Sequence, residues 1–265
     1  MKIAIAGAAG RMGQMLIRQI AGTPGCTLAG ALEGASSNAL GRDAGEVAGV
    51  GAKGVKIVSD AAAAIGAAQV VIDFTVPAAT VTHAKIASEK GVAMVIGTTG
   101  LDPAQTALIH EAAKKVPIMW AANMALGVNI LLALVEKTAS MLDPSYDIEV
   151  LEMHHRHKID APSGTALALG RAAAAGRKVK LEDVWRKSRD GHTGARPAGE
   201  IGFATLRGGD EVGFHTVHYA GIGERLELTH RAFSREIYAN GAVKAALWTE
   251  GRKAGLYSMK DVLGL

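Results

Sequence analysis

The segment from Glu152 to Thr165 gathers residue types that move protons and bind anions. Three histidines, an arginine and a lysine fill the five positions from His154 to Lys158. Histidine titrates near neutrality, so its ring can donate or accept a proton there. Neighbouring groups that can all carry positive charge repel one another, and a bound anion would relieve that repulsion. We therefore predict an anion-binding site with proton-transfer groups, against the plainer alternative of a solvated basic loop.

The residues that flank this cluster predict how it is held. A strand-like run over 146–153 precedes it, and Pro162 follows it. Proline restricts Ala161 to extended geometry and suits the start of a helix, which we place at about Ser163. The backbone N–H groups of Ser163-Gly164-Thr165 are then free donors for a second anion. A strand, a polar loop and a helix N-terminus in this order are a common way for α/β proteins to build a site.

A second motif stands at the N-terminus. The apolar run Lys2–Ala6 predicts a buried parallel strand, and a glycine-rich turn, Gly7-Ala8-Ala9-Gly10-Arg11-Met12-Gly13, leads from it into a helical pattern. Glycine at position 10 lets the backbone approach a pyrophosphate, and glycine at position 13 lets the helix pack closely on the strand. Glu33 ends the next predicted strand, about where a ribose-binding acid belongs. Together they predict a dinucleotide-binding turn rather than a merely tight connection.

Glu33 also bears on which dinucleotide binds. A carboxylate favours a free ribose 2′-hydroxyl and would repel a 2′-phosphate. The next residue is Gly34, which adds no positive charge, although Ser36, Ser37 and Arg42 could still reach a phosphate. We therefore expect the cofactor to be NADH or NADPH, with NADH used at least as well.

Strands alternate with helices throughout the first half of the chain. This order predicts an α/β fold with a doubly wound, parallel, Rossmann-type sheet in a dinucleotide-binding domain over residues 1–125. In such sheets the ligand lies along the carboxyl ends of the strands. Predicted strand ends carry Thr75, the segment Gly97-Thr98-Thr99-Gly100 and the segment Ala121-Ala122-Asn123-Met124. The alternative for Gly97 to Gly100 is ordinary turn chemistry.

The pattern changes after about residue 125. An apolar helix over 128–141 leads to the strand before the histidine cluster, and strands are predicted at 200–206, 211–219 and 224–230, with turns at 208–210 and 221–223. We predict a second, α+β domain with a mixed sheet over 126–235, for substrate binding and oligomerisation. The segment from about 236 to 265 is expected to pack back on the first domain. His215, His218 and His230 fall on strands and are interpreted as packing or interface residues.

Composition and net charge restrict the classes of ligand and binding site that we expect. The formal net charge is +4, which suits a small anionic ligand. We expect no nucleic-acid partner, because no long basic stripe is interleaved with aromatic residues. Cys26 is the one cysteine, so no intramolecular disulfide can form and a thiolate metal site is not expected. No stretch approaches 18 uncharged apolar residues, so we expect no membrane span and a cytoplasmic protein.

The chain resembles the 4-hydroxy-tetrahydrodipicolinate reductase (dihydrodipicolinate reductase) family. The resemblance rests on the turn Gly7 to Gly13, on Asp73-Phe-Thr75 with Gly97 to Gly100, and on the long segment His154 to Thr165. It implies NAD(P)H-dependent reduction of a ring dicarboxylate in lysine and diaminopimelate biosynthesis, by a homotetramer without a metal. Gly34 departs from the family, since many members carry an arginine there that can grip a 2′-phosphate.

The resemblance also implies a role for individual residues. His154 matches the general acid or base, and Lys158 matches the proton donor. The groups that hold the substrate carboxylates match His155, Gly164 and Thr165. The cofactor site matches Gly7, Ala8, Ala9, Gly10, Arg11, Met12, Glu33, Gly97, Thr98, Thr99, Ala121, Ala122, Asn123 and Met124.

Three other interpretations stay open from the sequence alone. Another two-domain NAD(P)-dependent dehydrogenase, acting on an amino or hydroxy acid, would share much of the pattern. A non-catalytic nucleotide-sensing protein would share the first domain. A zinc site at His154 and His155 is disfavoured, because adjacent residues in an extended segment point to opposite sides.

Overall fold

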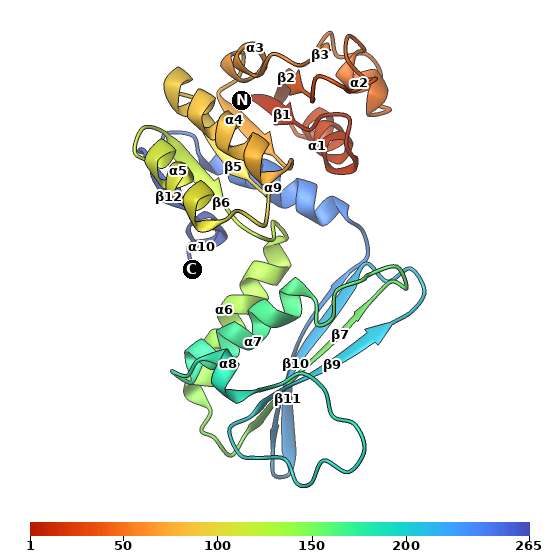
Figure 1. The fold of residues 1–265 in the computed structure, drawn as a ribbon, viewed down its shortest axis with the longest axis vertical. Helices are drawn as coiled ribbons and strands as arrows, with labels where there is room; N and C mark the ends of the chain where they lie inside the picture. The colour runs from red at the N-terminus through yellow and green to blue at the C-terminus, as the bar shows by residue number, and fades with distance from the viewer. The chain divides into compact units, whose positions relative to one another are not determined.

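The computed structural model describes all residues from 1 to 265. The chain forms two compact units (Figure 1). Unit 1 comprises Met1–Leu126 together with Glu236–Leu265, and unit 2 comprises Gly127–Arg235. The C-terminal segment thus belongs to the same unit as the N-terminus.

Unit 1 is built on a seven-stranded sheet in which every pair of neighbours is parallel. The strand order is β12-β6-β5-β4-β1-β2-β3, so the chain winds outward in both directions from β1 and β4. This confirms the predicted doubly wound sheet. The strands are β1 (Lys2–Ala6), β2 (Thr27–Leu32), β3 (Ile57–Val58), β4 (Val70–Asp73), β5 (Ala93–Ile96), β6 (Pro117–Trp120) and β12 (Gly255–Tyr257).

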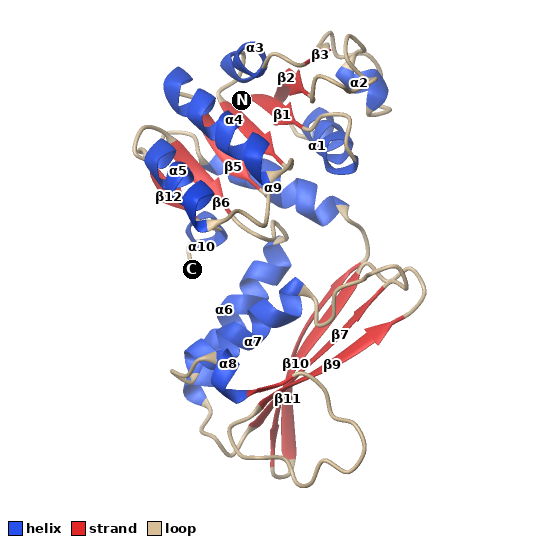
Figure 2. Ribbon diagram, viewed as in Figure 1, coloured by secondary structure: helices blue, strands red, loops and turns tan.

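Helices cover both faces of this sheet, and each face has its own hydrophobic core (Figure 2). In β1, Ile3 and Ile5 belong to one core, while Ala4 and Ala6 belong to the other. A strand buried on both sides needs a continuous apolar run, which is why Lys2–Ala6 shows no polar alternation. One core includes residues of α1 (Arg11–Gly22), α2 (Ala44–Val47), α9 (Glu236–Trp248) and α10 (Met259–Leu263); the other includes residues of α3 (Ala61–Gly66), α4 (Pro77–Lys90) and α5 (Pro103–Ala113).

Unit 2 contains a five-stranded sheet in the order β11-β10-β7-β9-β8. The β10 strand runs antiparallel to β7 and β11, whereas β9 runs parallel to β7 and β8, so the sheet is mixed as predicted. Within this unit the helices lie on one side of the sheet (Figure 2). The elements are α6 (Leu126–Met141), β7 (Asp147–His154), α7 (Gly164–Gly176), α8 (Leu181–Val184), β8 (Trp185–Arg186), β9 (Ile201–Arg207), β10 (Gly213–Gly221) and β11 (Glu224–Ala232).

One predicted turn has a different role in the structure. Gly221–Gly223 joins the antiparallel neighbours β10 and β11, as expected of a hairpin. Residues 208–210, in contrast, join two strands that are not neighbours, because β7 lies between β9 and β10. This connection crosses the end of β7, where Gly208 N–H donates to the carbonyl of His154 at 3.0 Å. Strand order is a long-range property, and the local turn residues did not reveal it.

Four short elements were not predicted from the sequence. They are α8, β8, β12 and α10, and none is longer than five residues. Segments this short hold too few residues for a periodic pattern to stand out, and tertiary pairing determines them. The β12 strand, for example, exists through its parallel pairing with β6.

Tyr219 ties the sheet of unit 2 to helix α6. Its side chain is fully buried, and its hydroxyl donates to the carbonyl of Val135 at 2.8 Å. Burial raises the pKa of Tyr219, so the hydroxyl keeps its proton and remains a donor at neutral pH. We expect Tyr219→Phe to lower the free energy of unfolding by about 1 kcal/mol, the usual net value of a buried hydrogen bond. Urea denaturation would measure this loss.

Tyr257→Phe is the matched control. Its hydroxyl donates to the carbonyl of Lys253 at 3.1 Å in an exposed position, where water can replace it. The expected loss is at most a few tenths of a kcal/mol. Equal losses for the two variants would contradict the role given to the buried bond.

Candidate active site

The buried face of β7 changes from apolar to ionisable along its length. Alternate residues of this strand are buried, namely Ile148, Val150, Glu152 and His154. The first two belong to the hydrophobic core of unit 2, while Glu152 and His154 continue the same face at the carboxyl end. A period of two along a strand places all four on one side. Glu152 was not predicted as a site residue, although its spacing from His154 was a signal that could have found it.

Glu152 and His154 form a buried pair. The Nδ1 atom of His154 lies 2.5 Å from Oε2 of Glu152, and the carboxylate is fully shielded from solvent. Arg207 reaches the same carboxylate through Nη1 at 2.9 Å and Nη2 at 3.0 Å. Burial opposes the charge of Glu152, but the hydrogen bonds from His154, Arg207 and the backbone N–H of Ser163 outweigh it and lower its pKa to about 2. Glu152 is therefore an anion at neutral pH.

Neighbouring strands supply the other members of this cluster. In the parallel pairing of β7 with β9, Arg207 stands opposite His154. In the antiparallel pairing of β7 with β10, His215 stands opposite Glu152. Residues directly opposite each other point to the same face of a sheet, so strand register brings the four side chains together. No local sequence pattern connects Arg207 or His215 to the histidine cluster.

His215 packs against His154 edge to face, with ring centroids 5.0 Å apart. This agrees with the predicted packing role, and the packing partner is the candidate proton-transfer residue. Burial, and next the nearby charge of His154, lower the pKa of His215 to about 3, so this ring is neutral at neutral pH. Its Nε2 lies 3.1 Å from the hydroxyl of Ser163.

The loop after β7 is held by backbone hydrogen bonds to the connection between β9 and β10. His155 N–H donates to the carbonyl of Glu211 at 2.7 Å, and Arg156 N–H donates to that of Gly209 at 3.3 Å. The ring of His155 turns toward Arg235, with Nε2 3.3 Å from the guanidinium. His154 and His155 therefore face different partners, as adjacent residues at a strand end do.

Lys158 projects from this loop and is partly buried. Its ammonium lies 2.8 Å from a carboxylate oxygen of Asp160, and this pairing lowers the pKa of Asp160. Lys158 is also close enough to His155 and His215 that its charge helps to lower the pKa of both rings. Glu152 and Asp160 supply two negative charges to this cluster from within the protein, beside the bound anion that the sequence predicted.

Helix α7 begins where Pro162 predicted, with Ser163 as its N-cap. The hydroxyl of Ser163 accepts from the backbone N–H of Ala166 at 3.1 Å. The prediction that the backbone N–H of Ser163 is a free donor was wrong, because this N–H donates to the carboxylate of Glu152 at 3.0 Å. Gly164 and Thr165 form the first turn of the helix, so the segment predicted to bind carboxylates starts directly beside the Glu152 cluster.

The glycine-rich turn of unit 1 has the close contacts that its spacing predicted. A Cβ at Gly13 would lie 2.0 Å from the carbonyl oxygen of Gly7, so only glycine fits there. Helix α1 starts after Gly10 without a side-chain cap, which leaves its first N–H groups available to an anion. The carboxylate of Glu33 accepts from Ala9 N–H at 2.7 Å. The turn and the acid, distant in sequence, thus meet at one edge of the sheet, which fits a dinucleotide.

The carboxyl ends of β4 and β5 are joined by a buried polar network around Asp73. This carboxylate is fully buried, and the hydroxyls of Thr75, Thr80 and Thr98 lie 2.6 to 3.1 Å from its Oδ1. His83 lies 2.6 Å from the other oxygen. The network holds Thr98 at the end of β5. Thr80 and His83, on α4, were not predicted.

Most of the other predicted cofactor residues lie along the same edge. A pocket of about 230 Å³ is lined by Thr98, Thr99, Ala121 and Ala122, together with Gly100, Leu101 and Trp120. The indole N–H of Trp120 donates to the carbonyl of Thr98 at 3.2 Å. Asn123 caps the next turn by accepting from Ala125 N–H at 2.9 Å. The side chains of Ala8 and Met124 are buried in the core, so these two positions offer a ligand backbone only.

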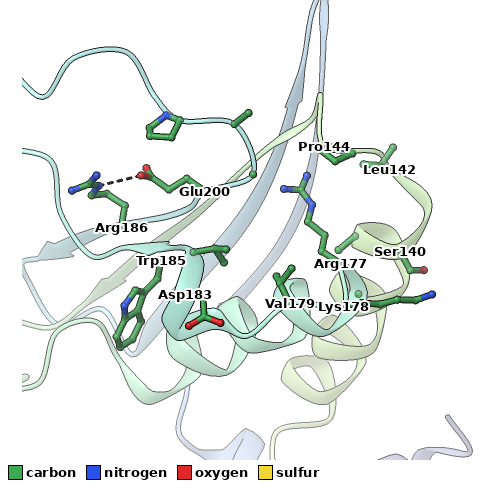
Figure 3. A pocket seen from close by; sticks show the side chains of 16 residues that line it. Ser140, Leu142, Pro144, Arg177, Lys178, Val179, Asp183, Trp185, Arg186 and Glu200 are labelled. Atoms are coloured by element: carbon green, nitrogen blue, oxygen red, sulfur yellow. Dashed lines mark hydrogen bonds and ion pairs between the residues drawn. The ribbon is translucent and has the colours of Figure 1, made fainter.

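A larger pocket of unit 2, about 590 Å³, lies among the ends of α6 and α7, α8 and residues 197–200 (Figure 3). Its lining includes Arg177, Trp185 and an ion pair between Arg186 and Glu200 with a separation of 3.1 Å. It contains none of the residues predicted to act in catalysis or binding. Size alone therefore does not identify the candidate site, because the predicted proton-transfer residues lie at the end of β7 instead.

Comparisons with known proteins decide the family. Two family models match, one described as dihydrodipicolinate reductase, N-terminus, over residues 1–124, and one as dihydrodipicolinate reductase, C-terminus, over residues 127–263. The chain belongs to the dihydrodipicolinate reductase family. A 4-hydroxy-tetrahydrodipicolinate reductase from Methylocella silvestris is 57% identical over all of this chain and 97% of its own length. The corresponding reductase of Afipia carboxidovorans is 54% identical, with the same coverage.

Solved structures agree on the fold. The dipicolinate-bound dihydrodipicolinate reductase from Paenisporosarcina sp. TG-14 has a TM-score of 0.78 at 22% identity, covering 98% of both chains. An amine dehydrogenase from Mycobacterium smegmatis has a TM-score of 0.60 at 14% identity, covering 97% of this chain and 94% of its own. The parallel sheet, the glycine-rich turn and the family together support a nicotinamide dinucleotide as cofactor. None of the helices combines the length and apolar character that a membrane span requires.

The Asp73 network predicts a strong effect of one substitution. Asp73→Ala removes the acceptor shared by three threonine hydroxyls, one backbone N–H and His83. We expect the free energy of unfolding to fall by roughly 3 kcal/mol or more, because several buried polar groups lose their partner together. NADH should also bind at least tenfold more weakly, since Thr98 loses its anchor. Chemical denaturation and fluorescence titration would measure the two effects.

Asp60→Ala provides the comparison. Asp60 also accepts from a backbone N–H, that of Ala63 at 3.0 Å, but it caps α3 at an exposed position. Its loss should cost about 1 kcal/mol and leave NADH affinity unchanged. The role given to the network is refuted if Asp73→Ala costs no more than Asp60→Ala.

Proposed function

We propose that this protein reduces 4-hydroxy-tetrahydrodipicolinate to tetrahydrodipicolinate with loss of water, using NADH or NADPH, in lysine and diaminopimelate biosynthesis. The observation that carries the proposal is that both halves of the chain match the same reductase family, and relatives at 57% and 54% identity carry that reductase name over full length. The site at the end of β7 suits the chemistry, because it combines proton-transfer groups with cations that can bind a dicarboxylate.

In this proposal unit 1 binds the dinucleotide. The turn Gly7 to Met12 and the start of α1 hold the pyrophosphate, and Glu33 holds the ribose. The nicotinamide end lies along the edge formed by Gly97 to Thr99 and Ala121 to Met124. A reduced nicotinamide bound there supplies the hydride. The buried Asp73 network supports this edge, because the carboxylate of Asp73 accepts a hydrogen bond from the hydroxyl of Thr98.

Unit 2 binds the substrate and moves the proton. His155, Gly164 and Thr165 hold the two carboxylates, with the adjacent helix start adding its positive end. Loss of the 4-hydroxyl group as water gives the ring a conjugated C=C–C=N system. Hydride addition to that system leaves a carbon that must take up a proton in the same turnover. His154 and Lys158 supply that proton. The charge of Lys158 is balanced by Asp160 in the free protein, and a substrate carboxylate of the same charge can take the place of Asp160.

We further propose that the protein acts as a homotetramer. The β11 strand supports this, because it is an edge strand whose residues are mostly exposed and include Leu226. Exposed edge strands are natural sites of pairing with another chain.

One assay tests the function. The protein is mixed with NADH and with the condensation product of pyruvate and aspartate semialdehyde, and nicotinamide absorbance is followed. Consumption of NADH that depends on this substrate supports the proposal. A nucleotide sensor would bind NADH without consuming it, and a different dehydrogenase would need an amino or hydroxy acid instead.

The cofactor preference is a separate prediction. Because Glu33 would repel a 2′-phosphate and Gly34 adds no positive charge, we expect kcat/KM with NADH to equal or exceed that with NADPH. Steady-state kinetics with both cofactors decide it. A large preference for NADPH would reject this prediction and point to Ser36, Ser37 or Arg42 as the phosphate site.

The proton-transfer residues give the sharpest test. We expect His154→Gln and Lys158→Ala each to lower kcat by on the order of a hundredfold or more, the usual scale for positioned proton transfer. NADH affinity should barely change, since unit 1 holds the dinucleotide. His157→Gln is the control, because His157 is exposed in the same loop and should matter much less. Near-normal turnover in both variants, or a defect confined to NADH binding, would disprove the assigned roles.

A further inference from the structure

Glu152 is surrounded by hydrogen-bond donors. Two come from the guanidinium of Arg207, one is the backbone N–H of Ser163, and the remaining neighbour is the ring of His154. An ionised carboxylate can only accept hydrogen bonds. The contact of 2.5 Å between Glu152 and Nδ1 of His154 therefore requires a hydrogen on Nδ1. The neutral ring then carries its lone pair on Nε2, and only Nε2 can exchange a proton with a ligand.

We propose that Glu152, clamped by Arg207, is the positioning residue of the active site: it fixes the Nδ1–H tautomer of His154 and so makes Nε2 the nitrogen that transfers the proton. This inference rests on the proposed function of His154. Glu152 itself touches neither substrate nor cofactor in this role. It acts through the ring that it orients.

The surroundings of Nε2 agree with this assignment. The nitrogen has no hydrogen-bond partner within the protein and is not among the buried unpartnered atoms. On the neighbouring strand, Gly213 leaves space beside it, since a Cβ there would lie 3.2 Å from Nε2. The ring thus has one nitrogen fixed by the protein and one left for a ligand.

Arg207 also connects Glu152 to the part of the loop near Lys158. Besides the carboxylate of Glu152, its Nη2 donates to the backbone carbonyl of Asp160 at 2.6 Å. The side chain of Asp160 in turn pairs with the ammonium of Lys158. Glu152 also bonds to Ser163, where the loop ends. One partly buried ion pair, Glu152 with Arg207, therefore holds the strand end with His154, the middle of the loop near Lys158 and the start of α7.

The experiment compares Glu152→Gln with Glu149→Gln. Both residues lie on β7, and both bind arginines: Glu149 bonds to Arg189 and Arg196 on the other face of the strand. In Glu152→Gln the side-chain amide can donate to Nδ1 of His154, which favours the opposite tautomer, with the hydrogen on Nε2. We expect kcat to fall at least tenfold with little change in KM for NADH. Glu149→Gln should keep near-normal kcat even if it loses stability.

The pH profile of kcat separates positioning from mere stability. The charged and titratable groups around His154 are Glu152 on its own strand, Arg207 on β9, His215 on β10, and His155 and Lys158 in the loop. Of these, Glu152 is the anion that favours a protonated ring. Its neutralisation should move the alkaline limb of kcat to lower pH, and Glu149→Gln should leave the profile unchanged. An unchanged kcat and profile in folded Glu152→Gln would overturn the inference.

Nitrogen NMR of the His154 ring tests the tautomer directly and needs no activity. The side-chain signals are assigned by comparison with His154→Gln and recorded at a pH where the ring is neutral. We expect the wild-type protein to carry the hydrogen on Nδ1 and Glu152→Gln to carry it on Nε2. A wild-type ring with its hydrogen on Nε2, or a mixture of both forms, would refute the inference, even if Glu152→Gln failed to fold.

The two readouts distinguish this inference from the proposed function. If the wild-type protein does not consume NADH with the dicarboxylate substrate, the proposed function fails, while the NMR measurement still decides the tautomer. If the enzyme is active and Glu152→Gln keeps full turnover, the function stands and the positioning role falls.

Discussion

A buried carboxylate that has lost its water must be surrounded by donors, and this constraint organises unit 2. Glu152 is fully shielded, and its charge is stable because a guanidinium, a ring N–H and a backbone N–H replace the lost water. Each donor comes from a different element: β9, the end of β7 and the start of α7. Because one carboxylate accepts hydrogen bonds from all three segments, it fixes their relative positions. The loop that carries Lys158 connects two of them, β7 and α7.

The same constraint recurs in unit 1 with different partners. Asp73 is equally buried, but hydroxyls and a histidine surround it instead of an arginine. Its position at the carboxyl end of β4 is where ligands bind in parallel sheets. In both units a buried carboxylate thus lies beside residues proposed to bind ligand, and its hydrogen bonds keep those residues in place.

The cluster at the end of β7 also shows how one site can hold several histidines. His215 is buried and neutral. Burial lowers the pKa of His155, and the nearby guanidinium of Arg235 lowers it further. His154 contacts the carboxylate of Glu152. Three residues of one type therefore have different electrostatic surroundings within one cluster. The proposed roles of His154 and His155 differ in the same way, since the two rings face different partners.

The sequence by itself determined the parts of this protein that depend on neighbours in the chain. Apolar runs and their spacing predicted the parallel strands, and Gly10 with Gly13 predicted the dinucleotide turn. Pro162 with Ser163 predicted the start of α7. The cluster His154 to Lys158 predicted the candidate site, because its residues are neighbours in the chain. Only the tertiary structure decided what surrounds that cluster. Arg207 lies 55 residues from Glu152, and His215 lies 52 residues from Ser163. Strand order and register bring them together, and no periodicity within a segment encodes which strands become neighbours.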